Sequence, residues 1–101
     1  MNKPTTKIAA TLRQVAELIA AGLPVPGNIA ILFDRIDLQF HHDRAEDVDA
    51  WAHAMGAAPE QDAHVYGEAT GVRPWRAYEV TGTLAGFPVR AWASVPVEVT
   101  R

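Results

Sequence analysis

The chain has 101 residues, of which 49% are hydrophobic and 21% are charged, and it contains no cysteine. These values are typical of one globular domain over residues 1–101, and they exclude disulfides, thiolate metal sites and cysteine nucleophiles. A net charge of −3 argues against a general nucleic-acid binder, which usually carries a basic surplus. Since no apolar run has the length of a signal-peptide core or a membrane span, we expect a cytoplasmic protein.

Residues 5–21 carry the pattern of an amphipathic helix. Its apolar stripe consists of side chains that recur every three or four residues: Ile8, Leu12, Val15 and Ile19. Gly22 suits the end of this helix, because glycine takes the left-handed conformation at low cost. Residues 23–27 contain two prolines and are predicted to be a stiff connector.

Residues 28–40 are predicted to form a β-hairpin that the rest of the chain covers or extends. With a turn at Asp34 and Arg35, six apolar side chains fall on one face as three facing pairs: Phe33 with Ile36, Ile31 with Leu38, and Ile29 with Phe40. The turn is neither Asn-Gly nor Asp-Gly, so a longer loop also fits.

A second helix is predicted from Asp43 to Met55. Asp43 and Glu46 fit a capping box at its start, and Gly56 suits its end. Its buried stripe is expected to consist of Val48, Trp51, Ala52 and Met55. Arg44 and Asp47 are placed to form a local ion pair.

The C-terminal third is predicted to contain three strands. A short strand at residues 62–67 is followed by a mobile loop at 68–74. Residues 75–81 and 87–95 then form a second hairpin around Leu84 and Ala85. In that register the facing pairs are Val80 with Val89, Tyr78 with Ala91, Glu79 with Arg90, and Ala77 with Trp92.

The element order is therefore helix, strand, strand, helix, and then three strands. One apolar sheet face and two apolar helix stripes predict an α+β two-layer sandwich. Both helices would pack on one face of a mainly antiparallel sheet of four or five strands. Residues 1–4 and 97–101 are expected to be frayed.

Two groups of polar side chains raise the question of an ion site: His41, His42 and Asp43 in sequence, and Glu46, Asp49 and His53 on one helical face. Neither has the spacing of a recognised metal motif. We interpret the first as the end of a strand and the start of a helix, and the second as a solvated helix face. Whether either group binds an ion is left open.

The sequence contains no recognised motif for a catalytic nucleophile or for phosphate binding. Ser94 is the only serine and is not part of a GxSxG sequence. The segment 67–71 lacks the lysine of a phosphate loop. We therefore predict a protein without enzymatic activity and without a cofactor.

Arginine and aromatic residues gather in the C-terminal third, and six of them are the candidate partner-binding residues: Tyr66, Arg73, Trp75, Arg76, Arg90 and Trp92. Tryptophan and arginine are over-represented where proteins bind partners. The alternative is a half-buried framework in which arginines cover the indoles through cation–π contacts.

We predict an interaction protein that binds a protein partner, or a second copy as a homodimer, through its open sheet face or an edge strand. The second candidate is a nucleic-acid-binding accessory protein that uses these arginines and tryptophans. The third candidate is a small-ligand or metal binder.

Three segments resemble small uncharacterised proteins of actinobacteria and their phages. They are LPVP at Leu23–Pro26, EDVDAWAHAMG at Glu46–Gly56 and VTGTLAGFPVRAW at Val80–Trp92. The resemblance brings no activity and no catalytic residue. It implies an accessory protein, of phage or mobile-element origin, rather than a metabolic enzyme.

Overall fold

The computed structural model describes residues 4–67 and 73–97. The chain forms two helices and five strands: α1 (Pro4–Ala20), β1 (Asn28–Ile31), β2 (Ile36–Gln39), α2 (Ala45–Met55), β3 (Glu60–Gln61), β4 (Trp75–Leu84) and β5 (Phe87–Pro96). The predicted α+β class and element order are confirmed. Most of the predicted mobile loop at 68–74, and the expected frayed residues 1–3 and 98–101, lie outside the described residues.

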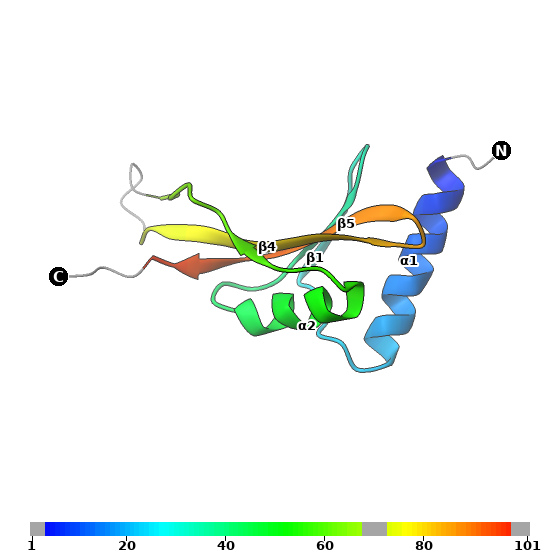
Figure 1. Ribbon diagram of the computed structural model, residues 1–101, viewed down its shortest axis with the longest axis horizontal. Coiled ribbons are helices and arrows are strands. Elements are labelled where there is room, and N and C mark those ends of the chain that lie inside the picture. The colour runs from blue at the N-terminus through cyan, green and yellow to red at the C-terminus, as the bar shows by residue number, and fades with distance from the viewer. Residues whose placement is uncertain (1–3, 68–72, 98–101) are drawn as a thin grey trace.

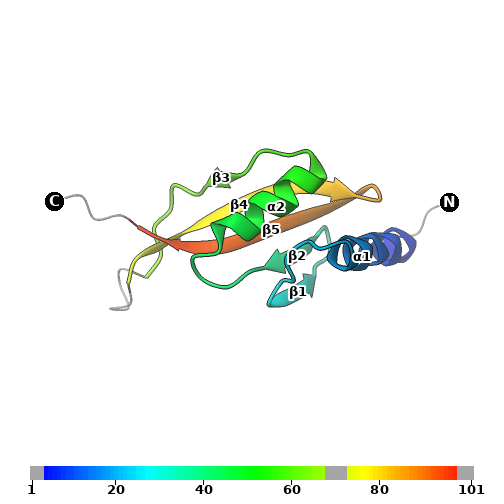
Figure 2. The same ribbon diagram turned by 90° about the horizontal axis from the view of Figure 1, so that it is seen from below.

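The five strands form one sheet in the order β1-β2-β5-β4-β3. Neighbouring strands are antiparallel except β2 and β5, which run parallel with Ile36 beside Val89 and Leu38 beside Ala91. Figure 2 shows β1 as the outermost strand on one side of the sheet and β3 on the other. The long β4–β5 hairpin therefore occupies the interior of the sheet.

The first predicted hairpin is confirmed, but its register was wrong by two residues. Ile31 faces Ile36 and Ile29 faces Leu38. The loop spans residues 32–35, and the Leu32 N–H donates to the Arg35 carbonyl at 2.8 Å. Because the shift is by two residues, each side chain keeps its predicted face.

The second predicted hairpin is also confirmed, again with a register error of two residues. Its turn is at Ala85 and Gly86, which have φ values of 52° and 79°. Positive φ at both positions gives a turn whose twist matches that of the strands. The predicted pairs are therefore replaced by Val80 with Ala91, Tyr78 with Ala93, Glu79 with Trp92, and Ala77 with Ser94.

The strand predicted at residues 62–67 was wrong in its position. β3 pairs with β4 only at Glu60 and Gln61, and one isolated bridge joins Tyr66 to Trp75. Between these points the Asp62 carboxylate accepts a hydrogen bond from the His64 N–H at 3.0 Å. This side-chain turn bends the chain away from the ladder, because it offers the backbone a competing partner.

α2 lies beneath the sheet and supplies the centre of the core (Figure 1). Three of its four predicted core residues, Val48, Trp51 and Ala52, are buried, while Met55 is half-buried. They pack with buried side chains of β2, β4 and β5: Ile36, Leu38, Val80, Val89, Ala91 and Ala93. The Trp51 indole N–H donates to the Pro24 carbonyl at 2.9 Å, which fixes the connector to the helix.

The predicted capping box at the start of α2 was wrong. Asp43 has a φ of 64°, and the helix begins at Ala45 after Arg44 with no side-chain cap. Asp43 instead adopts a left-handed conformation, and its backbone N–H donates a hydrogen bond to the Ser94 carbonyl at 2.7 Å. The predicted ion pair between Arg44 and Asp47 is confirmed at 3.0 Å.

α1 stands across the turn end of the β4–β5 hairpin (Figure 1). Val15 of its apolar stripe is buried, and Thr11 is also buried, with its hydroxyl 2.7 Å from the Leu84 carbonyl. At its C-terminus, the Gly22 N–H donates to the Ile19 carbonyl and the Leu23 N–H donates to the Leu18 carbonyl. Glycine permits this hydrogen-bond pattern at a helix end. Within the described residues, neither helix has the length and apolar character needed to cross a membrane.

Candidate interaction surfaces

Three aromatic side chains stack in line on the open face of the sheet, opposite α2. The Tyr66 and Trp75 rings are 4.4 Å apart at 17°, and the Trp75 and Trp92 rings are 6.4 Å apart at 23°. We call Tyr66, Trp75 and Trp92 the aromatic row. It arises because the Tyr66–Trp75 bridge and the β4–β5 pairing place side chains of three segments on one face.

The arginine next to the aromatic row is neutralised by acidic neighbours. The Arg90 guanidinium carbon lies 5.0 Å from the centre of the Trp92 ring. Arg90 forms ion pairs with Glu79 and with Asp37, the latter at 3.4 Å. Asp37 also pairs with Arg35 at 2.7 Å, and this hydrogen bond raises the pKa of Arg35. The open face therefore combines stacked rings with balanced charge.

Four of the six predicted site residues are brought together, namely Tyr66, Trp75, Arg90 and Trp92. Arg76 lies on the opposite face because neighbouring residues of a strand point to opposite sides. Arg73 is exposed in the segment before β4. The sequence grouping failed for these two because it relied on proximity along the chain. The rings of the row are half-buried, as the framework interpretation requires.

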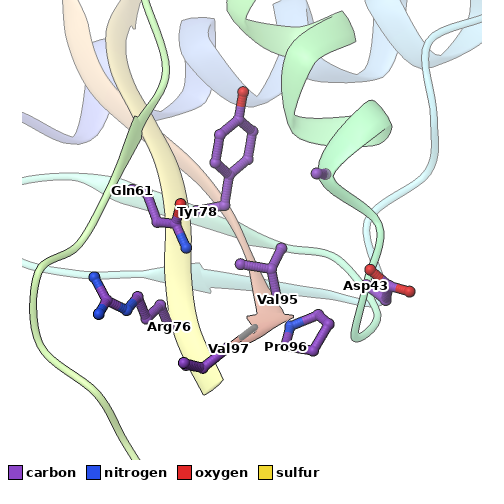
Figure 3. A pocket seen from close by; sticks show the side chains of 8 residues that line it. Asp43, Gln61, Arg76, Tyr78, Val95, Pro96 and Val97 are labelled. Carbon is purple, nitrogen blue, oxygen red and sulfur yellow. The ribbon is translucent and has the colours of Figure 1, made fainter. Parts of the chain in front are cut away.

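Arg76 lines a pocket of about 630 Å³ on the helix side of the sheet. Figure 3 shows Arg76 and Gln61 on one side of this pocket, Asp43 on the other, and Tyr78 pointing toward α2. The Tyr78 hydroxyl donates to Asp49 at 2.5 Å. This hydrogen bond raises the pKa of Tyr78 to about 12.

The histidines that follow β2 lie at a second hollow of about 370 Å³. His42 Nδ1 is 2.8 Å from the Ser94 hydroxyl, a contact that sequence reasoning missed because no local signal links positions 52 residues apart. Both side chains are in an exposed setting, and no acidic side chain of the described residues bonds to His42 to orient it as a base. Within residues 4–67 and 73–97, no three His, Cys, Asp or Glu side chains are grouped to hold a metal ion.

The exposed large hydrophobic side chains of the described residues all lie in one short stretch at the sheet edge. They are Val25 (68% exposed), Ile29 (42%), Ile31 (55%), Leu32 (38%) and Phe33 (100%). We call these five residues the apolar edge. The hairpin prediction placed Ile29, Ile31 and Phe33 in the core, and this was wrong. Both helices contact β4 and β5, so neither covers β1.

The backbone of β1 is also open on its outer side. The Leu32–Arg35 bond sets the alternation of the antiparallel ladder, so that Asn28 and Ala30 bond to β2. The N–H and carbonyl groups of Ile29 and Ile31 consequently point away from the sheet. No charged residue occurs between Glu17 and Asp34, whereas edge strands are usually protected by charges.

Comparisons with protein-family models, with curated proteins and with solved structures found no match to this chain. The resemblance to actinobacterial and phage proteins therefore stays a prediction. Function has to be argued from the surfaces themselves.

Proposed function

We propose that this chain is a small, non-enzymatic interaction protein that binds an extended strand of a protein chain along β1. The observation that carries this proposal is the gathering of all exposed large apolar side chains of the described residues at the apolar edge. In strand addition, the main chain supplies hydrogen bonds, and side chains at alternate positions supply apolar contact. Ile29 and Ile31 offer both, because their backbone N–H and carbonyl groups point outward and about half of each side chain is exposed.

The apolar edge is a better binding surface than the aromatic row. The faces of the row's rings already contact one another, and Arg90 is held by Asp37 and Glu79. The same ion pairs leave Arg90 little charge to offer a phosphate backbone, so they do not favour the nucleic-acid candidate. The β4–β5 hairpin has neighbours on both sides, β3 and β2, which leaves β1 as the free edge with apolar side chains.

The test is photo-cross-linking in the native host, with a benzophenone amino acid at Phe33 or, as the control, at Thr83. Both positions are exposed, but Thr83 lies on β4, away from the apolar edge. We expect a covalent adduct of discrete mass, identified by mass spectrometry, with the Phe33 probe only. Adding Ile31→Pro should abolish this adduct, because proline has no N–H to donate to an added strand. Equal labelling from Phe33 and Thr83, or an adduct that survives Ile31→Pro, would refute the proposal.

A further inference from the structure

We infer that the strand bound along β1 is the β1 strand of a second copy of this chain, antiparallel about a two-fold axis through Ala30. This inference rests on the proposed function and names the partner for the same edge. Two-fold pairs are the commonest symmetric assemblies, and they require a surface patch that complements itself. The apolar edge meets this requirement in its backbone, its side chains and its charges.

The backbone pattern selects the register. Only Ile29 and Ile31 have outward N–H and carbonyl groups within β1, so hydrogen-bonded pairs must form between these positions. Antiparallel pairing of Ile29 with Ile31 of the second copy uses the outward groups of both residues in both copies. Ala30 then faces Ala30 of the second copy as a non-hydrogen-bonded pair.

The side chains of the apolar edge are distributed on both sides of this axis. Phe33 follows β1 in the loop and Val25 precedes β1, so an antiparallel pair brings Phe33 of one copy toward Val25 of the other. Phe33 and Val25 are the two most exposed large hydrophobic residues of the described chain, and this arrangement covers both. They lie on opposite sides of Ala30, and each would meet the other copy's counterpart.

The charges are compatible with a second copy. No charged residue lies within β1, so no two like charges meet where the two strands pair. The uncharged stretch from residue 18 to residue 33 includes every position that would pair within β1. A strand from an unrelated protein that carries charge at its contact positions would desolvate that charge against Ile29 and Ile31 without a partner.

The register is tested by disulfide trapping, for which the chain is suited because it has no cysteine. Ala30→Cys places two thiols on facing residues with Cα atoms about 4.5 Å apart, within the range that a disulfide spans. Asn28→Cys is the matched control on the same strand and face. Its two copies would be about 13 Å apart, since each is offset by four residues from its facing position.

We expect Ala30→Cys to form a disulfide-linked dimer under mild oxidation at least about tenfold faster than Asn28→Cys, because thiols held far apart cannot bridge. Asn28→Cys mixed with Leu32→Cys should give the mixed dimer, because residues 28 and 32 face each other in this register. Equal rates for Ala30→Cys and Asn28→Cys, whether fast or slow, would overturn the inference.

Sedimentation of the unmodified chain separates the two proposals. We expect a mass that doubles from 11.0 kDa with rising concentration, and Ile31→Pro should stay monomeric. A strict monomer would overturn the inference. If the Phe33 probe in the host still gives an adduct with a different protein, the proposed function stands without a second copy. If that adduct is also absent, both proposals fail.

Discussion

Proline substitutions at two adjacent positions of β1 should lower the folding stability by very different amounts. Ala30→Pro removes an N–H that bonds to β2, which costs about 1 kcal/mol, and leaves the facing carbonyl unpaired, which adds about 1–3 kcal/mol. We expect a total loss of about 2–4 kcal/mol. Ile31→Pro removes an N–H that points to solvent. Since Ile31 is 55% exposed, losing the buried half of its side chain costs about 1 kcal/mol. Proline also lowers the conformational entropy of the unfolded chain, which stabilises the folded state by about 0.4–1 kcal/mol.

The assay is urea unfolding at a protein concentration low enough for the chain to be monomeric, followed by circular dichroism. Ile31→Thr is the control, because it shortens the side chain and keeps the amide. We expect Ile31→Pro and Ile31→Thr to lie within about 1 kcal/mol of each other, with Ala30→Pro at least about 1 kcal/mol less stable than either. If Ile31→Pro proves the more damaging proline, the outward direction of the Ile31 amide is refuted, and with it the basis for strand addition at β1.

Three further predictions concern the core and the two sheet faces. Trp51→Phe should lower the free energy of unfolding by about 2–4 kcal/mol in urea titration, because it removes buried volume and leaves the Pro24 carbonyl without its donor. The tyrosine absorbance change near 295 nm should include a late step whose midpoint is near pH 12, and Tyr78→Phe should remove this step. The hydrogen bond to Asp49 raises the pKa of Tyr78 to about 12, so the stability that it contributes is complete below pH 10 and is lost between pH 10 and 12. Arg90→Gln should cost about 1–3 kcal/mol in thermal unfolding, since the little-exposed Glu79 loses its cation and Asp37 keeps only Arg35. An unchanged melting temperature would contradict that role for Arg90.

Local sequence patterns were sufficient to predict both helices and both hairpins of this fold, but not the position of β3. Apolar spacing marked both helices, Gly22 and Gly56 marked their ends, and alternation marked both hairpins. The register of each hairpin was missed by two residues, because a shift of two keeps every side chain on its face and leaves the apolar pattern equally satisfied. Only the turn geometry distinguishes the two registers, and the Ala85–Gly86 turn was not recognised from its sequence.

The interaction surfaces depend on tertiary arrangement, which single-sequence patterns do not contain. Ile29 and Ile31 have the same alternation as Ile36 and Leu38, yet only the latter pair is buried in the core with Val48 and Trp51 of α2. Nothing in the apolar pattern of the two strands distinguishes β2 from β1 as the neighbour of β5. Conversely, strand alternation alone could have separated Arg76 from Trp75, and that signal was present in the sequence.

The parallel pairing of β2 with β5 has a consequence for biosynthesis. Asp37 and Arg90 meet across 53 positions of the chain, whereas the two strands of the second hairpin are joined by a tight turn. Contacts between distant segments form slowly, because a long loop must close first. Until β5 has left the ribosome, the first hairpin has no neighbour on either side. We expect the nascent chain to be most prone to aggregation in that interval, when two hydrophobic strand edges are open at once.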